Sequence, residues 1–286
     1  MESKKKCYRF YNYVKFALPN PDIKVMPAAA DALGKIVDAG GPVFDEAFMD
    51  YEVPGAIEQL VSERQFNGRY AGVLILKELA LHNSTCFHPH ISLVFDKLLL
   101  PLRDTRLYVR EAAAELLAAC LEIIAQRERQ SKTPFSTKLL QDAQAGLKMT
   151  QAEVIHGSLL MYRELLLHSG MFMKESYLDT AETIIRLRSH RDPLIRKTII
   201  QLIPTLAVYD NKSFSEHFLH KAMSHLLESL TRPAERSAAF IAIGQVSTSV
   251  KGDMKKFLDL IMDNVKQGLQ MRGYGLKVIL KYLLHY

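Results

Sequence analysis

The sequence predicts an all-α fold, an α-solenoid built from about six helical hairpins. Three observations predict it. Apolar residues recur with helical spacing along most of the chain, no stretch alternates in the manner of a β-strand, and related segments return about every 40 residues. The composition agrees, because proline (11) and glycine (14) are few among 286 residues, and leucine and alanine are plentiful.

The repeat is clearest in two pairs of segments, each pair 86 positions apart. VLILKELALHNS begins at Val73 and LLMYRELLLHSG at Leu159, while VREAAAELLAACL begins at Val109 and IRKTIIQLIPTLA at Ile195. Half of that interval falls within the ~40–47 residues of HEAT and armadillo units. We therefore predict repeats of the HEAT or armadillo kind.

Each copy can be aligned at one position near the start of its second helix. Successive aligned positions are 43, 41, 45, 41 and 40 residues apart. Small residues often follow them, which lets neighbouring helices approach closely. The aligned positions are Met26, Arg69, Arg110, Ile155, Arg196 and Arg236.

A first helix is predicted ahead of each aligned position, from apolar residues at i, i+3, i+4 and i+7. The predicted first helices cover 7–18, 54–62, 91–102, 137–149, 177–188, 217–230 and 254–269. Turn signals separate them from the second helices. These signals are Pro19 to Asp22, Asn67-Gly68, Arg103 to Thr105, Asp192-Pro193 and Arg232-Pro233.

We divide the chain into a short basic tail (1–7), a solenoid (8–270) and an atypical C-terminal tail (271–286). Neither end has the polar outer face of a capping repeat, so we interpret both ends as cut from a longer protein. The exposed apolar faces expected on the helices at 7–18 and 254–269 predict self-association.

The net charge of +6 is mild and dispersed. One basic cluster stands out: Arg186, Arg188, Arg191 and Lys197. These residues could face phosphates or an acidic protein partner, and a solvated helix end and turn is the alternative. No nucleic-acid partner is expected.

The three cysteines lie far apart and form no C-x-x-C, which indicates a reducing compartment. No apolar run approaches the ~18 residues that a membrane-spanning helix needs. We therefore expect a cytoplasmic location and no transmembrane segment.

The triplet His190-Arg191-Asp192 matches the start of the kinase catalytic loop H-R-D-L-x-x-x-x-N. That loop needs asparagine five positions after the aspartate, where this chain has Lys197. No D-F-G, V-A-I-K or G-x-G-x-x-G accompanies the triplet. Asp192 followed by Pro193 is instead typical of a capped helix start, so we predict no catalytic residue in this chain.

The segment CFHPH, from Cys86 to His90, carries metal-binding residue types, but no second His/Cys pair lies at a zinc-site spacing. We predict no metal and no cofactor. His82 and His168 fall at equivalent repeat positions, which indicates a structural role at helix ends.

The role of the four aligned arginines can be interpreted in two ways. Arg69, Arg110, Arg196 and Arg236 can form a ladder with acidic residues of adjacent turns, such as Asp104 or Asp192, or they can face a partner. We favour the ladder, because its repetition follows the fold and not a single ligand.

From about Tyr8 to Arg272, the chain resembles the N-terminal HEAT-repeat region of the target of rapamycin (TOR) kinases. The segments that carry the resemblance are RYAGVLILKELALHNSTCFHPHISLVFDKLLLPLRD, REAAAELLAACLEIIAQRE, IHGSLLMYRELL, LIRKTIIQLIPTLAVYD and ERSAAFIAIGQVSTSV. The resemblance implies a serine/threonine kinase of the phosphatidylinositol-kinase-related group, whose kinase, rapamycin-binding and FAT regions lie outside this segment. It implies a non-catalytic scaffold for dimerisation with a second TOR copy and for a Raptor-like or Rictor-like companion, in the cytoplasm or peripherally on endomembranes or in the nucleus.

A free-standing HEAT-repeat adaptor of the importin kind is the alternative. Its groove would need an acidic, aromatic-rich inner face, whereas acidic residues here are scattered and tryptophan is absent. An enzyme in its own right is a third class, for which no motif is present.

Overall fold

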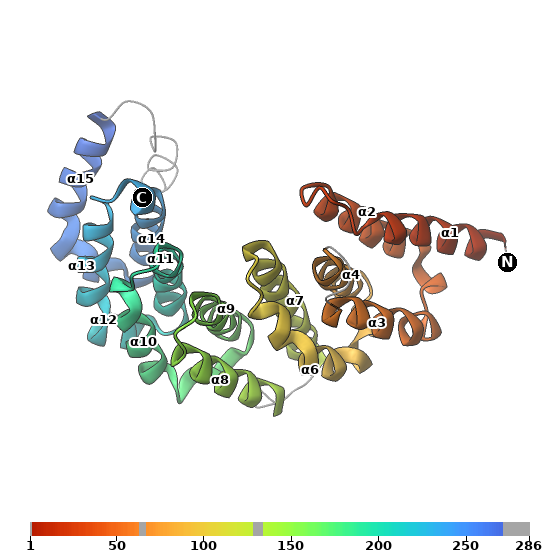
Figure 1. Ribbon diagram of the computed structural model, residues 1–286. Helices are drawn as coiled ribbons and strands as arrows, with labels where there is room; N and C mark the ends of the chain where they lie inside the picture. The colour runs from red at the N-terminus through yellow and green to blue at the C-terminus, as the bar shows by residue number, and fades with distance from the viewer. Residues whose placement is uncertain (1, 63–66, 128–133, 271–286) are drawn as a thin grey trace. The chain divides into compact units, whose positions relative to one another are not determined.

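The computed structural model describes residues 2–62, 67–127 and 134–270. Within these ranges the chain forms fifteen α-helices and five short 3-10 helices, with no strand (Figure 1). The prediction of an all-α fold is confirmed. The helices divide into two compact units, unit 1 (Met1–Phe172) and unit 2 (Met173–Tyr286), which are described separately.

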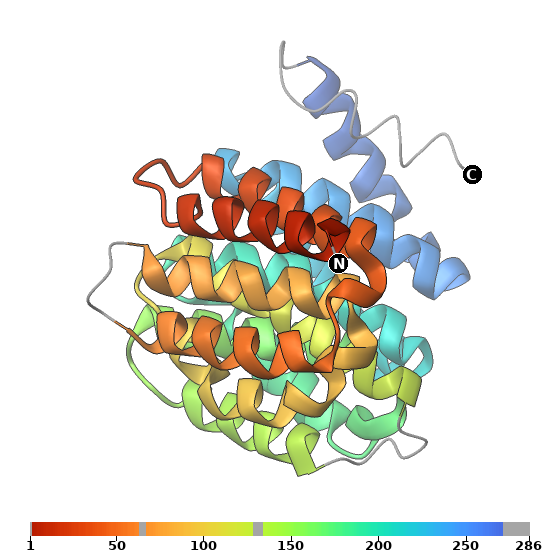
Figure 2. The ribbon, with the colours of Figure 1, turned by 90° about the vertical axis from the view of Figure 1, so that its right-hand side faces the viewer.

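Unit 1 consists of four helical hairpins. In each, the first helix packs beside the second, and the second helices pack against one another in succession, α2 on α4, α4 on α7 and α7 on α9 (Figure 2). The hairpins are α1 (Glu2–Ala17) with α2 (Val25–Gly40), α3 (Glu46–Val61) with α4 (Gly68–His82), α6 (Ile91–Leu102) with α7 (Leu107–Arg127), and α8 (Pro134–Leu147) with α9 (Ala152–His168). The short elements η1 (Gly41–Val43), α5 (Ser84–Phe87), η2 (His88–His90) and η3 (Gly170–Lys174) follow second helices.

Unit 2 continues the same plan, and its second helices α11 and α14 pack closely together. Its elements are α10 (Tyr177–Arg186), η4 (Leu187–Ser189), α11 (Pro193–Tyr209), α12 (Asn211–His217), α13 (Leu219–Ser229), α14 (Pro233–Val250), η5 (Lys251–Phe257) and α15 (Leu258–Gln270). Every aligned position of the sequence repeat lies in the first turn or so of a second helix, as the pattern predicts.

Some predicted boundaries are wrong. The helix predicted at 54–62 begins at Glu46, because the Asp45 side chain accepts a hydrogen bond from the Phe48 amide and caps the helix there. Pro54 lies inside this helix, although proline suggested its start. The helix predicted at 217–230 is interrupted between α12 and α13.

Of the domain boundaries that we predicted, only the one at residue 7 falls between described residues. Helix α1 begins at Glu2, so the boundary that we placed at residue 7 lies within a helix. The C-terminal tail at 271–286 lies outside the described residues.

The N-terminal helix is held by an aromatic cluster and a buried carboxylate. Tyr8 and Tyr11 of α1 pack against Phe44 and Phe48, with ring centroids 5.0–5.7 Å apart. The buried Glu52 of α3 accepts a hydrogen bond from the Tyr11 hydroxyl (3.0 Å) and pairs with Lys15 (2.6 Å). A carboxylate removed from water in this way needs both partners, so it fixes α1 against α3.

The opposite face of α1 exposes aromatic rings. Phe10, Tyr13 and Phe16 are 60%, 58% and 91% exposed, and Leu258 and Leu260 of α15 are more than half exposed. These faces agree in position with the expected apolar ends, and self-association through them stays a prediction.

Two helix ends share one uncommon backbone conformation. After α2, Gly41 has φ 47° and ψ −117°, and after α14, Lys251 has φ 49° and ψ −117°. Glycine adopts positive φ without steric cost, whereas a Cβ atom makes that region unfavourable. Lysine at 251 is therefore strained where glycine at 41 is not.

We expect Lys251→Gly to raise the free energy of unfolding by about 1 kcal/mol, since it removes this strain. Urea unfolding followed by circular dichroism would measure the change. Gly41→Ala is the matched reverse change, because the new Cβ would meet no atom within 4 Å and only the φ penalty would act. A destabilised Lys251→Gly variant would contradict the expectation.

Candidate functional site

The aligned arginines of unit 1 connect neighbouring hairpins. Arg69 donates from Nε to the Leu60 carbonyl of its own hairpin (3.1 Å) and from Nη1 to Asp104 of the next one (2.7 Å). Its side chain and that of Asp104 are nearly buried, at 12% and 2% exposure. One guanidinium therefore satisfies a helix-end carbonyl and pairs with a carboxylate one repeat further on.

Arg110 makes the corresponding connection in the next repeat. Its Nη1 donates to the Asp104 and Thr105 carbonyls of its own turn (2.6 and 3.0 Å), and its Nε donates to Nδ1 of His156 on α9 (3.0 Å). Both Arg110 and His156 are buried. Because Arg110 donates to it, Nδ1 of His156 is an acceptor, and the neutral imidazole carries its proton on Nε2.

Unit 2 repeats the arrangement. Arg196 donates from Nη1 to the His190 and Arg191 carbonyls (2.9 and 3.0 Å) and from Nε to Glu235 of the next hairpin (2.7 Å). Arg236 donates from Nε to the Leu230 carbonyl (2.7 Å). We call these four residues, Arg69, Arg110, Arg196 and Arg236, the arginine ladder, and their inward contacts favour a structural role.

Of the two acidic partners that we expected for the ladder, only Asp104 pairs with an arginine of it. Asp192 instead caps α11 by accepting hydrogen bonds from the Leu194 amide (2.8 Å) and the Ile195 amide. The acidic partner in unit 2 is Glu235, which sequence reasoning missed. Its signal was its place one residue before the aligned Arg236.

Asp104 is the acidic centre of the ladder in unit 1. Its carboxylate accepts hydrogen bonds from the Arg106 amide, Nε and Nη2, each 2.9 Å long, and from Arg69. Burial opposes its ionisation, but the hydrogen bonds from Arg106 and Arg69 outweigh this effect. The pKa of the Asp104 carboxyl is consequently held well below its usual range.

Two histidines at equivalent repeat positions join second helices. Nδ1 of His82 lies 2.6 Å from Asp38 on α2, and its Nε2 lies 3.3 Å from Glu78. His168 of α9 has the same arrangement, with Glu122 of α7 at 3.3 Å and Glu164 at 3.4 Å. Because the same arrangement of one histidine and two carboxylates occurs at equivalent repeat positions, we interpret these contacts as structural and not as a route for proton transfer.

The kinase-like triplet lies in the turn that leads into α11. Asp192 is committed to capping, and His190 Nδ1 accepts a hydrogen bond from the Asp192 amide (3.0 Å). In the CFHPH segment, His90 lies 3.4 Å from Asp50. Among the described residues, no group of three His, Cys, Asp or Glu side chains could hold a metal ion.

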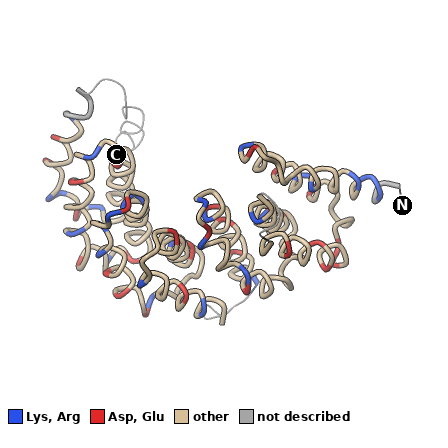
Figure 3. The backbone as a smooth tube through the Cα atoms, viewed as in Figure 1, with Lys and Arg blue, Asp and Glu red and all other residues tan. Residues whose placement is uncertain are grey.

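The basic cluster (Arg186, Arg188, Arg191 and Lys197) surrounds that same turn. Arg186, Arg191 and Lys197 are exposed and form no ion pair in the part of the chain that the structure describes, while Arg188 donates to the Ile185 carbonyl (3.2 Å). Elsewhere basic and acidic residues are interspersed along the helices (Figure 3). The cluster therefore presents unneutralised positive charge at one turn.

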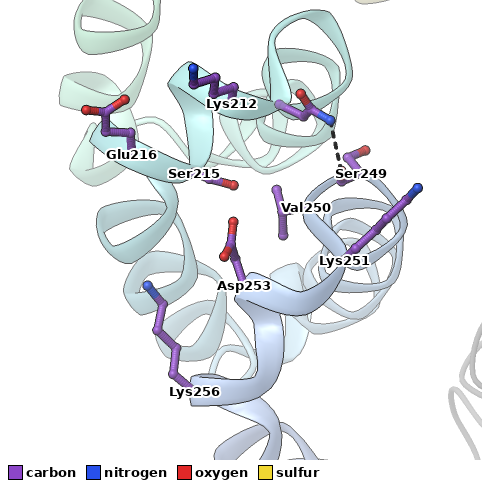
Figure 4. Close-up of a pocket in the computed structure, with 9 residues that line it drawn as sticks. Lys212, Ser215, Glu216, Ser249, Val250, Lys251, Asp253 and Lys256 are labelled. Carbon is purple, nitrogen blue, oxygen red and sulfur yellow. Dashed lines mark hydrogen bonds between the residues drawn. The ribbon is translucent and has the colours of Figure 1, made fainter.

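A polar depression beside α12 and η5 is the other candidate in unit 2. It is lined by Lys212, Ser215, Glu216, Asp253 and Lys256, among others (Figure 4). Asp253 points into it, whereas the three lysines drawn there point in different directions. Since no set of like charges converges on one point, we assign it no ligand.

Comparison with known proteins shows which proteins the repeats are similar to. The chain is 37% identical over 261 residues to the serine/threonine-protein kinase tor1 of Schizosaccharomyces pombe, and 34% identical over 274 residues to the TOR kinase of Arabidopsis thaliana. These matches cover 91% and 95% of this chain but 11% of each kinase. The resemblance to TOR is thereby confirmed, and the chain spans about a tenth of the length of these relatives. No model of a known protein family matches the chain.

Solved structures show the fold. Importin beta superposes with a TM-score of 0.67 at 15% identity, over 94% of this chain and 34% of importin beta. A Kap121p mutant superposes with a TM-score of 0.65 at 12% identity, over 96% of this chain and 28% of that protein. The prediction of a helical-repeat solenoid is confirmed, and at these identities the likeness extends to fold alone. In the described residues no helix is long and apolar enough to cross a membrane.

Proposed function

We propose that this chain, which is similar along most of its length to one segment of the TOR kinases, is a non-catalytic scaffold for complex assembly and dimerisation in nutrient and growth signalling. The observation that carries the proposal is the combination of the TOR similarity with an all-helical repeat fold in which Arg69, Arg110 and Arg196 tie neighbouring hairpins together. Extended helical repeats offer long surfaces to protein partners. The serine/threonine kinase activity belongs, on this proposal, to other parts of such a protein.

The basic cluster is the surface that we propose for a companion protein of the Raptor or Rictor kind. Among the described residues its three exposed cations have no ion-pair partner, so an acidic surface could approach without displacing existing ion pairs. A second copy of the chain is the other proposed partner. The likeness to importin beta concerns fold alone and gives no support to a transport function.

A binding measurement tests this proposal. The full chain is immobilised and titrated with purified Raptor-like or Rictor-like protein, and self-association is followed by sedimentation. We expect the triple variant Arg186→Glu, Arg191→Glu, Lys197→Glu to weaken companion binding about ten-fold at low salt. The matched control reverses two exposed lysines of unit 1, Lys97→Glu and Lys148→Glu, and should bind normally.

Two outcomes would count against the proposal. A folded chain that binds neither companion nor itself would exclude the scaffold function. Equal weakening by the control pair would show that the overall charge, and not the basic cluster, governs binding.

A further inference from the structure

A small apolar cavity of about 150 Å³ lies between the first helices of two consecutive hairpins, α6 and α8. The fully buried Leu102 and Met161 and the nearly buried Leu139 line it. Phe95 of α6 and Phe135 of α8 meet beside it, with ring centroids 5.2 Å apart. We call this space the anchor cavity.

The volume of the anchor cavity limits what it can hold. Sites for drug-sized ligands and cofactors measure roughly 300–1,000 Å³, so a cofactor does not fit. A cavity of about 150 Å³ lined by Leu, Ile and Phe stays dry in another protein and binds benzene. The anchor cavity therefore matches a single aromatic or branched aliphatic side chain.

The rim of the cavity is charged, and one of its carboxylates has no partner in the part of the chain that the structure describes. Asp96 of α6 pairs with Lys138 of α8 (3.2 Å). One helical turn beyond Lys138, Asp142 also lines the cavity, and its carboxylate has no ion-pair or hydrogen-bond partner among the described residues. The rim is net negative, which complements a cation next to the inserted side chain.

The sequence that directly precedes helix α8 contains no aromatic or branched aliphatic residue. Residues 128–133 read ERQSKT, all of them polar, and they directly precede Pro134 at the cavity. A polar segment cannot fill an apolar space of this kind favourably.

We propose that the anchor cavity receives a Phe or Leu side chain from a partner protein, in a segment where a Lys or Arg directly follows that residue. The apolar side chain enters between α6 and α8 and contacts Leu139 and Met161. The adjacent cation pairs with Asp142. This site lies in unit 1 and does not depend on the basic cluster or on the function proposed above.

The experiment uses the full chain with ¹³C-methyl methionine and two probes, N-acetyl-Phe-Lys-amide and N-acetyl-Phe-Glu-amide. We expect the Met161 methyl resonance to shift and saturate at millimolar probe concentration, while Met223 of unit 2 stays unchanged. The lysine probe should bind about two- to five-fold more tightly than the glutamate probe at low salt, and Asp142→Asn should abolish that difference.

A filling variant tests the location. Leu99 lines the cavity and is partly exposed, so Leu99→Trp should occupy the space and weaken the binding of both probes at least about ten-fold. Leu93, 40% exposed on the same helix, does not line the cavity, and Leu93→Trp should bind normally. Circular dichroism confirms that both variants fold.

Four results would overturn the proposal. An unchanged Met161 resonance, or shifts that persist in Leu99→Trp, would exclude the cavity as an anchor site. Equal binding of the two probes would exclude the adjacent cation. Self-association that Leu99→Trp abolishes would show that a second copy of the chain occupies the cavity.

Discussion

Gly157→Ala is expected to destabilise the chain by about 3 kcal/mol or more, the upper end for overpacking a core. A Cβ atom at 157 would overlap the carbonyl oxygen of Leu102 and lie 2.9 Å from its carbonyl carbon. Both are backbone atoms at the end of α6, so no rotamer change can make room. Helix α9 would have to move away from α6, and the packing between two hairpins would be lost.

A second glycine, Gly72 of α4, is also packed against backbone. A Cβ atom at Gly72 would lie 2.5 Å from the Ala56 carbonyl oxygen and 2.6 Å from the Leu60 amide nitrogen, both in α3. Gly72→Ala should therefore also destabilise unit 1. The two glycines do not occupy equivalent repeat positions, because Gly72 faces the first helix of its own hairpin and Gly157 faces that of the preceding hairpin.

Gly55 supplies the matched control for Gly157. It lies inside α3, and an added Cβ would meet no atom within 4 Å. Gly55→Ala should raise the free energy of unfolding by about 0.5–1 kcal/mol, because alanine is the better helix former. Urea unfolding of the three variants would measure the differences. If Gly157→Ala matched Gly55→Ala, the close approach of α9 to α6 would be refuted.

Gly72 and Gly157 show which features of the helix packing could be predicted from the sequence. Small residues after most of the aligned positions predicted close helix approach, and Gly72 and Gly157 lie where a side chain would collide with backbone. The start of α3 could not be predicted, because Pro54 suggested a helix start while the weaker Asp45 cap decided it. The Asp45 cap therefore set the start of α3, and the helix accommodates proline at position 54.

The arginine ladder could be predicted from the sequence repeat, whereas the anchor cavity could not. Arginine at equivalent positions indicated a ladder, but the sequence allowed Asp192 to be either a helix cap or a ladder partner, and the structure shows the cap. The anchor cavity has no sequence signal at all. It arises from the spacing of α6 and α8, which depends on how every side chain between them packs.

Asp104→Asn is expected to cost about 3 kcal/mol at pH 7, since it removes the charge that pairs with Arg69 and Arg106. Asparagine keeps the size of the side chain but presents one oxygen and an amide that cannot accept. Two guanidinium groups would then remain near a turn without their counter-charge. Asp142→Asn, at a carboxylate that forms no ion pair with any described residue, is the matched control and should change stability by less than about 0.5 kcal/mol.

The pH dependence distinguishes loss of charge from loss of shape. The pKa of Asp104 is lower in the folded chain than the ~3.9 of an unfolded one, so its stabilising contribution is complete above that value and is lost as the pH falls below it. The difference in unfolding free energy between the original chain and Asp104→Asn should thus stay constant from about pH 5 to 8 and shrink below about pH 4. A difference that persists unchanged to pH 3 would mean that asparagine disrupts the turn sterically, and that the charge of Asp104 does not hold the second and third hairpins together.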